Sequence, residues 1–136
     1  MYRVIRASED FEEMDRYDQE NFAKRTSDPS VLAKLADNED YRIRAGVASN
    51  ENTSAEILAR LAEDEDDFVR EMVAYNENTL AEILENLADD WNWRVRLCVA
   101  GNINTPVNIL QRLADEGGQV GQCAMETLNF VEPLLT

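Results

Sequence analysis

The chain has 136 residues, of which 44% are hydrophobic and 30% charged, a balance that predicts one folded domain over residues 1–136. Because it contains no histidine and two cysteines, the sequence excludes zinc sites with histidine ligands, histidine-based triads and four-thiolate metal centres. The net charge of −15 disfavours direct contact with nucleic acid or an anionic membrane. It would attract a partner with a basic surface, although charge alone favours the simpler reading that the acids keep the protein soluble.

Residues 1–26 precede the repeated part of the chain. The opening stretch MYRVIRA, residues 1–7, is predicted as either a short strand or an extended arm. Residues 8–25 are predicted as one helix with Ser8 as its N-cap. A partial apolar stripe predicts that this helix caps the first repeat: Phe11, Met14, Tyr17 or Asp18, and Phe22. The stretch has no apolar signal core, and no part of the chain approaches the ~18 apolar residues of a membrane span, so we expect a cytoplasmic location.

Residues 27–118 are built from a 26-residue repeat. The full units are 41–66, 67–92 and 93–118. The first two are identical at more than half of their positions, far above chance. A half unit at 27–40 precedes them, and a degenerate half unit follows, so residues 119–136 are predicted as a C-terminal cap.

Each unit contains two short apolar stripes with helical spacing. In the first full unit, the first helix carries Ile43 and Val47, and the second carries Leu58 and Leu61. Helices of roughly 8–11 residues are marginal alone, so the stripes must be buried against neighbouring units. The sequence therefore predicts an all-α solenoid with two helices in each repeat.

The tetrapeptide NENT, or its variant NINT, stands between the two helices of each unit. The first Asn of each copy is predicted to end the first helix, either in the left-handed conformation or by bonding its amide to backbone groups: Asn50, Asn76 and Asn102. Thr53 and Thr79 are predicted as N-caps of the second helix, because a Glu follows each after three residues. Thr105 has Pro106 behind it, another helix start signal.

One arginine recurs on the first helix of each unit. Asp64 and Asp90 lie six residues before Arg70 and Arg96. This spacing predicts a ladder of Asp–Arg pairs between stacked units.

The second and third units, VREMVAYNENTLAEILENLADD and VRLCVAGNINTPVNILQRLADE, resemble the leucine-rich repeat variant family and, more distantly, HEAT repeats. The resemblance covers roughly residues 27–130. It implies a right-handed superhelix without a sheet, no catalytic residues and a surface used for binding. Some family members carry an N-terminal cysteine cluster with an iron–sulfur centre. This chain has no cysteine before Cys98, so no cofactor is expected.

Two features could carry chemistry but have simpler interpretations. Cys98 and Cys123 fall in the core column of successive first helices, so we interpret them as small apolar residues, with a redox or metal pair as the alternative. The acidic run at 63–67 lacks the glycine and glutamate spacing of a calcium loop, which favours a solvated turn.

The residues that break the repeat are the candidate partner-binding site. Tyr75 and Trp91 are aromatic residues at positions that vary between units, and acidic turns lie beside Trp91. The predicted partner-binding set is Asp64, Glu65, Asp66, Asp67, Tyr75, Asp89, Asp90 and Trp91.

These features predict a non-catalytic protein–protein interaction module with a protein partner that has a basic surface. A more specific hypothesis is an acidic inhibitor that occupies a basic nucleic-acid-binding groove, as anti-CRISPR, anti-restriction and nuclease-immunity proteins do. This hypothesis rests on size and charge alone. A scaffold that self-associates through its solenoid ends is an alternative, and an enzyme is a third reading that no motif supports.

Overall fold

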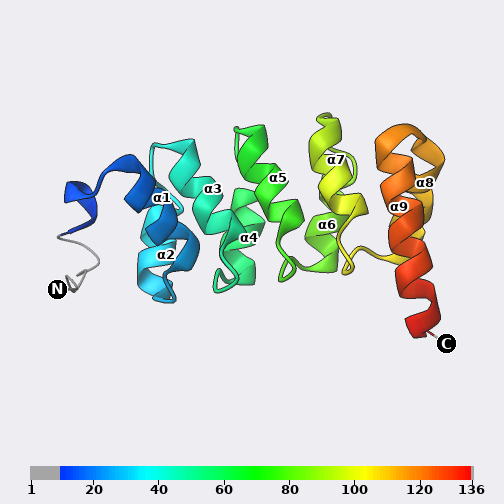
Figure 1. Ribbon diagram of the computed structural model, residues 1–136, viewed down its shortest axis with the longest axis horizontal. Helices are drawn as coiled ribbons and strands as arrows, with labels where there is room; N and C mark the ends of the chain where they lie inside the picture. Colours follow the sequence, from blue (N-terminus) through cyan, green and yellow to red (C-terminus); the bar gives the residue numbers. More distant parts are fainter. Residues whose placement is uncertain (1–9, 136) are drawn as a thin grey trace.

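The computed structural model describes residues 10–135, and every regular element in this range is a helix. The predicted strand or arm at 1–7 and the predicted N-cap Ser8 lie outside the described residues. Two kinds of helix alternate along the chain (Figure 1). The A helices are α1 (Arg16–Arg25), α3 (Tyr41–Ser49), α5 (Asp67–Tyr75), α7 (Trp93–Ala100) and α9 (Gly118–Val131). The B helices are α2 (Pro29–Leu35), α4 (Ala55–Leu61), α6 (Ala81–Leu87) and α8 (Val107–Glu116). The 3₁₀ helices are Phe11–Glu13 and Glu132–Leu135.

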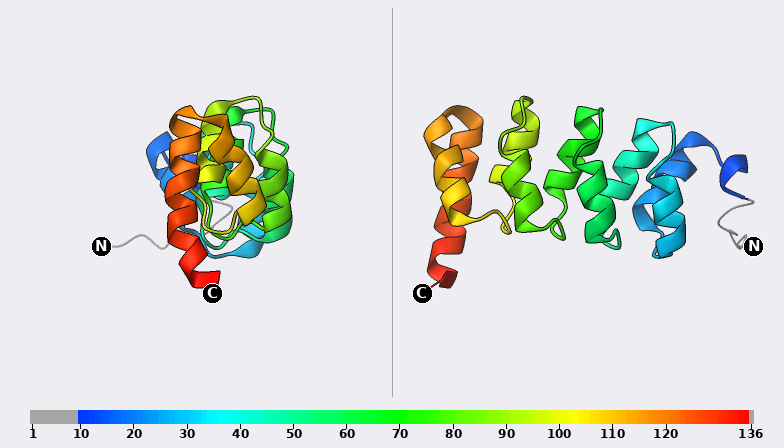
Figure 2. Two further views of the ribbon diagram at one scale, coloured as in Figure 1. Left: turned by 90° about the vertical axis from the view of Figure 1, so that its right-hand side faces the viewer. Right: turned by 180° about the vertical axis from the view of Figure 1, so that it is seen from behind.

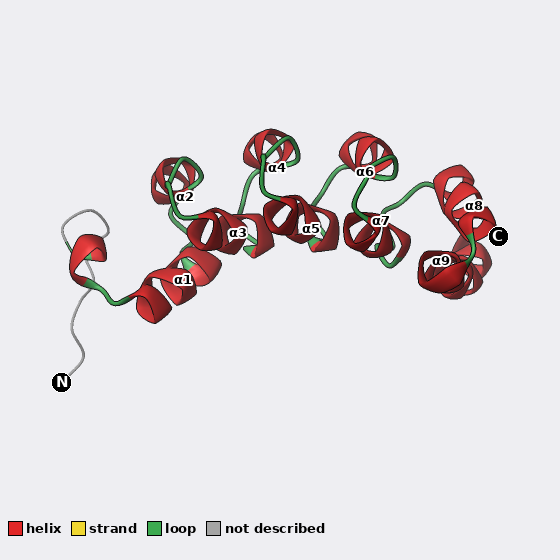
Figure 3. Cartoon of the chain, turned by 90° about the horizontal axis from the view of Figure 1, so that it is seen from above, coloured by secondary structure: helices red, strands yellow, loops and turns green. Residues whose placement is uncertain are grey.

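The helices form two layers along one axis (Figures 1 and 2). Each A helix contacts the next A helix, from α1 through α9. Seen from above, the A helices form a closely stacked row, while the B helices stand apart on the outer side of a shallow arch (Figure 3). The free face of the A layer is therefore concave. The predicted all-α solenoid of two-helix repeats is confirmed. None of the helices in residues 10–135 could cross a membrane.

The hydrophobic core lies between the two layers. In the first unit, Ile43 and Val47 of α3 and Leu58 of α4 are at most 1% exposed. The same stripe positions are buried in the other units, as the spacing predicted: Val69, Val73, Leu84, Val95, Val99 and Leu110. Burying such a side chain stabilises the fold by about 1.5–3 kcal/mol. Because neighbouring units share each buried surface, one unit alone lacks the partners that its stripes need.

The predicted helix over residues 8–25 is interrupted in its described part. Phe11–Glu13 is a separate 3₁₀ helix, Met14 is extended, and α1 begins only after Asp15. The side chain of Asp15 accepts a hydrogen bond from the Asp18 backbone N–H at 2.8 Å and so acts as the N-cap. The prediction of one continuous helix was therefore wrong, because an internal Asp supplied a stronger start signal than the run of acids before it. Helix α1 packs against α3 at the N-terminal end of the row of A helices.

The threonines of NENT do not cap the B helices, contrary to the prediction. Helix α4 begins at Ala55 and its N-cap is Ser54, whose hydroxyl accepts from the Ile57 N–H at 3.2 Å. Thr53 lies one residue earlier, is buried, and donates its hydroxyl to the Val47 carbonyl at 2.6 Å. The bond recurs in the later units: Thr79 to Val73 at 2.6 Å and Thr105 to Val99 at 2.7 Å. The hydroxyl gives a second bond to a carbonyl in the last turn of the A helix, which also accepts from the backbone N–H of the following asparagine.

The asparagines that end the A helices join successive repeats. The φ angles of Asn50 and Asn76 are −74° and −69°, and no described residue other than glycine has a positive φ, so the left-handed prediction was wrong. The alternative prediction, amide bonding to backbone groups in the turn, is confirmed for the amide oxygen, whereas the bonds that the amide donates reach the preceding repeat. The buried Asn76 amide donates to the carbonyls of Ala48 at 2.8 Å and Asn50 at 3.0 Å, and its oxygen accepts from the Asn78 N–H at 2.8 Å. Asn102 bonds to Ala74 and Asn76 in the same way.

The end of the row closes through glycines between α8 and α9. Gly117 and Gly118 have φ angles of 79° and 61°, a region that favours glycine and that lets the chain reverse directly between the helices. A Cβ on Gly121 would lie 2.8 Å from the Ala114 carbonyl oxygen, so only glycine permits this close helix packing.

Candidate interaction surface

The solenoid has two edges that carry different turns. Turns from a B helix to the next A helix, such as 62–66 and 88–92, lie along one edge, here called the B-to-A edge (Figure 1). The NENT turns, such as 76–80, lie along the opposite A-to-B edge. The nine residues of α5 separate the two edges by about 14 Å, at 1.5 Å per residue. The structure therefore places Tyr75 apart from the other predicted binding residues, which all lie on the B-to-A edge.

Two of the predicted acidic residues, Asp64 and Asp90, are occupied by internal ion pairs. Asp64 pairs with Arg44 through two bonds of 2.8 and 3.1 Å, and the two side chains are only 9% and 13% exposed. Asp90 pairs with Arg70 at 2.8 and 3.3 Å. These hydrogen bonds raise the pKa values of Arg44 and Arg70 against the opposing effect of burial. Both carboxylates therefore hold the fold together and present little charge to solvent.

The Asp–Arg ladder exists, but its pairing differs from the prediction. Each carboxylate bonds the arginine twenty residues before it. The arginine six residues after each aspartate bonds the backbone carbonyl of that aspartate and not its carboxylate. Arg70 donates to the Asp64 carbonyl at 2.8 Å, and Arg96 donates to the Asp90 carbonyl at 2.7 Å. Each aspartate thus links two arginines of adjacent A helices.

The remaining residues of the B-to-A edge are partly engaged. Asp66 caps α5 by accepting from the Phe68 N–H at 2.8 Å, and Asp67 accepts from the Asn92 amide at 2.5 Å. Glu65 is exposed, and Asp89 is exposed but pairs with Arg112 at 3.0 Å. Trp91 is 78% exposed, and its ring lies 5.9 Å from the Arg70 guanidinium carbon.

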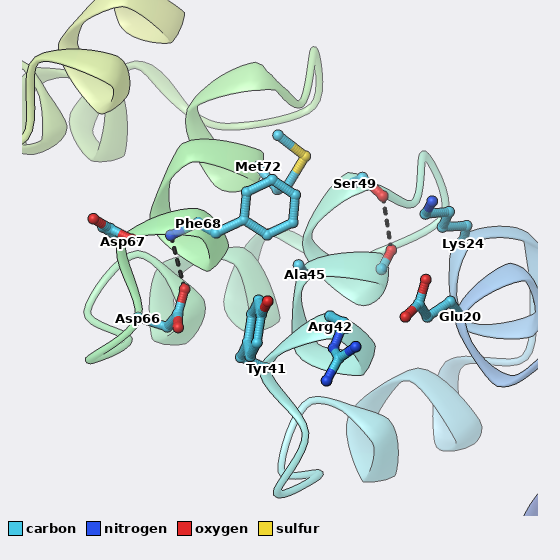
Figure 4. Close-up of a pocket in the computed structure, with 11 residues that line it drawn as sticks. Glu20, Lys24, Tyr41, Arg42, Ala45, Ser49, Asp66, Asp67, Phe68 and Met72 are labelled. Atoms are coloured by element: carbon cyan, nitrogen blue, oxygen red, sulfur yellow. Dashed lines mark hydrogen bonds between the residues drawn. The ribbon is translucent and has the colours of Figure 1, made fainter. Parts of the chain in front are cut away.

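The concave face of the A layer carries a groove across α1, α3 and α5, here called the N-terminal groove, with a volume of about 550 Å³. Its apolar wall is made of Tyr41, Phe68 and Met72, which Figure 4 shows side by side. The rings of Tyr41 and Phe68 meet edge to face with centroids 6.3 Å apart. The charged residues at this groove are mixed in sign: Glu20, Lys24, Arg42, Asp66 and Asp67.

A second groove of about 530 Å³, here called the Tyr75 groove, crosses the carboxyl ends of α3, α5 and α7. It shares Ser49 with the N-terminal groove, so the two grooves adjoin at this residue. Tyr75 stands in it between Ser49 and Gly101, the residues at the same position of the neighbouring units. Asparagines of the turns also line it. The remaining lining residues are acidic or apolar: Glu51, Glu77, Leu97, Cys98 and Ile103.

The cysteines lie at this face as free, half-buried thiols. Burial, together with the charge of Glu71, raises the pKa of Cys98 to about 11. Burial also raises the pKa of Cys123, whose thiol faces the Leu97 carbonyl at 4.0 Å. Both thiols are therefore neutral at pH 7, which agrees with their interpretation as packing residues.

Sequence reasoning missed most of the groove. Phe68 occupies a helix position where the other units have Arg42 and Arg94, and this variation is the same signal that singled out Tyr75. Glu51 and Glu77 are the second residues of the two NENT copies, whose Asn and Thr carry the turn signals. The change of that Glu to Ile103 in the third copy was the available clue that its side chain faces solvent.

The comparisons with known proteins agree with this architecture. The model of the family described as leucine rich repeat variant matches residues 41–66, the unit that contains α3 and α4. No curated protein and no solved structure matches the chain. The resemblance predicted from the sequence is confirmed for this unit. Residues 41–66 thus match a leucine rich repeat variant unit, and the chain stacks further helix pairs with the same inter-unit asparagine bonds beside it.

Proposed function

We propose that this chain is a non-catalytic interaction module whose concave A-layer face binds a protein partner with a basic surface. One observation carries the proposal: two adjoining grooves expose large apolar and aromatic side chains on one face of a protein with a net charge of −15. Such side chains in a concave surface are the usual anchors of protein interfaces. The excess of acids supports a basic partner, because opposite charge steers encounter and fixes orientation.

A test compares the groove with the B-to-A edge. The groove variant carries Tyr41→Ala, Phe68→Ala and Tyr75→Ala, and the matched edge variant carries Trp91→Ala and Glu65→Gln. Each chain is used to capture partners from its native cell. The proposal expects a basic protein that the original chain and the edge variant retain and the groove variant loses. A partner lost only by the edge variant would contradict it.

A more specific form of the proposal is an inhibitor that covers a nucleic-acid-binding groove of its partner. The net charge supports it, since a strongly acidic surface can compete with phosphates for basic side chains. The captured partner would then lose its nucleic acid when the chain is added in equimolar amount. Raising the salt concentration from ~50 to ~500 mM would also dissociate the partner from the chain, because salt screens exposed charges. A ternary complex with nucleic acid would contradict this form.

The alternative of a self-associating scaffold is supported by the exposed apolar residues near the C-terminal end of the row. Phe130, Leu134 and Leu135 are each more than 60% exposed. Light scattering across a concentration series tests it. Self-association requires a mass that rises with concentration and that Phe130→Ser together with Leu134→Ser lowers. A concentration-independent monomer mass excludes it.

A further inference from the structure

Resting on the proposed function, we propose that the Tyr75 groove binds an arginine side chain of the partner. The guanidinium lies on the face of the Tyr75 ring and pairs with the carboxylates of Glu51 and Glu77. The occupant is thus a basic segment of a protein, in which arginine is preferred over lysine.

The groove favours a cation through two independent features. Its two charged lining residues, Glu51 and Glu77, are both acidic, whereas the N-terminal groove has charges of both signs. Helices α3, α5 and α7 also end here, and none has a basic residue in its last turn. The carboxyl end of a helix carries partial negative charge, which is usually balanced by a cation nearby. The site therefore lacks a positive charge that a partner can supply.

Tyr75 differs from Tyr41, Trp91 and Trp93, three other exposed rings of the repeats, in having no arginine of its own, and it also lacks the ring contact that Phe68 makes with Tyr41. Arg42 lies 5.3 Å from the centroid of Tyr41, Arg94 lies 5.6 Å from that of Trp93, and Trp91 has Arg70 beside it. Within residues 10–135, no such cation contact is formed by Tyr75, although its side chain is 67% exposed. The chain thus stacks arginine on three repeat-face aromatics and leaves the ring in the acidic groove free for an external one.

The space around Tyr75 suits the shape of an arginine. Its neighbours in the same helix position, Ser49 and Gly101, are small, and the Tyr75 side chain is 67% exposed, so neither neighbour places a bulky side chain against the ring. Leu97 and Ile103 provide apolar surface for the methylene stem of the arginine. A planar guanidinium stacks on a ring and bonds carboxylates at its edge, whereas an ammonium group cannot do both equally well.

The backbone of the two acidic residues is held in position before any partner arrives. The Asn78 amide donates to the Glu51 carbonyl at 2.5 Å, and the Asn104 amide donates to the Glu77 carbonyl. These bonds connect each NENT turn to the next, so the two glutamates stay in register across the repeat. A preorganised site loses less conformational entropy on binding.

The test titrates the full chain, labelled with nitrogen-15, with hexaarginine and hexalysine peptides in ~50 mM salt, where surface charges are weakly screened. We expect hexaarginine to shift the amide signals of Tyr75, Glu77 and Gly101 and to bind more tightly than hexalysine. Tyr75→Ala should weaken hexaarginine about fivefold, the effect of an exposed cation–π contact. Tyr75→Phe should bind like the original chain, and Glu77→Gln should weaken binding without the ring being touched.

Trp91→Ala is the matched control, because it removes an equally exposed ring from the B-to-A edge. Unchanged hexaarginine affinity in this variant is expected. If Trp91→Ala weakens hexaarginine as much as Tyr75→Ala does, or if the signal shifts are confined to the B-to-A edge, the arginine site is overturned while a basic partner stands. If hexaglutamate binds and hexaarginine does not, both the arginine site and the basic partner of the proposed function are overturned.

Discussion

The side-chain amide of Asn76 donates a hydrogen bond to the carbonyl of Ala48, 28 residues earlier and one repeat away, at 2.8 Å. The contact is buried, and the same amide holds the Asn50 carbonyl. It sets the register between α3 and α5 because an asparagine in any other register would leave the buried Ala48 carbonyl without this donor. The repeat length therefore follows from polar bonds as well as from apolar packing.

Replacing Asn76 by Ala should lower the free energy of unfolding by about 3 kcal/mol, because the buried Ala48 carbonyl and the Asn78 N–H lose this partner and the Asn50 carbonyl keeps only the Thr53 N–H. Urea denaturation followed by circular dichroism measures this change. Asn78→Ala is the control, since its amide bonds at an exposed position and should cost about 1 kcal/mol or less. Equal losses of stability in the two variants would show that the buried asparagine bonds contribute no more than the exposed ones.

Replacing Leu80 by Ser should stabilise the fold by about 1 kcal/mol. Leu80 is the N-cap of α6, is half exposed, and makes no side-chain cap bond, whereas the equivalent Ser54 caps α4. The reverse change, Ser54→Ala, should cost a similar amount. Thermal unfolding of the two single variants checks the pair. A loss of stability in Leu80→Ser would contradict the assignment of the cap to this position.

Replacing Asp90 by Ala should destabilise the protein by about 3 kcal/mol, because Arg70 would remain charged and largely buried without its carboxylate. Glu65→Ala, which removes an exposed acid from the same edge, should change stability by less than about 0.5 kcal/mol. Chemical denaturation gives both values. If Asp90→Ala were as mild as Glu65→Ala, the ion pair would be solvated in solution. Charge changes at Asp90 or Asp64 therefore probe folding before they probe binding.

Cys98 should react slowly with alkylating reagents. Its pKa of about 11, against an ordinary value of 9.0, leaves roughly a hundredfold less thiolate near neutral pH than a free thiol has. The rate of iodoacetamide reaction in a Cys123→Ser variant, compared with a small thiol, measures this directly. A rate close to that of the small thiol would contradict burial of Cys98.

The same shift makes stability depend on pH in the alkaline range. Because the folded pKa is raised, folding favours the neutral thiol, so the contribution of Cys98 to stability is fully present below about pH 9 and falls as pH rises towards 11. A Cys98→Ala variant should lose less stability over this window than the original chain. Parallel denaturation curves across the window check the difference.

The layers of the fold were predictable because hydrophobic spacing is a local property of the sequence. Val47 and Leu58 repeat at helical intervals, and no other arrangement buries both stripes. The role of Thr53 was not predictable in the same way. A hydroxyl beside a helix start can accept from that helix or donate to the preceding one, and the choice depends on the path of the turn. Helix α4 begins one residue later than predicted, so Ser54 is its N-cap and Thr53 donates to the preceding helix.

The candidate site was less accessible from sequence than the fold. Tyr75 was found because it differs from Ser49 and Gly101, but the acids nominated beside Trp91 include Asp64 and Asp90, which bond internally. Sequence shows charge but does not show which carboxylates already have a partner. Which residues share an edge of the solenoid is likewise known only once the direction of each helix is known. The structure places Tyr75 beside Glu77 and away from Trp91.

The asparagine bonds of each unit point back to the unit before it, and this has a consequence for how the chain can grow. A second copy of residues 67–92 inserted after residue 92 would find the carbonyls of Ala74 and Asn76 as acceptors and would offer the same carbonyls to Asn102. Gene duplication in steps of 26 residues can thus lengthen the protein without inventing a new contact. Each step would add one more tyrosine and one more glutamate to the groove, so evolution can change reach and valency by copying alone.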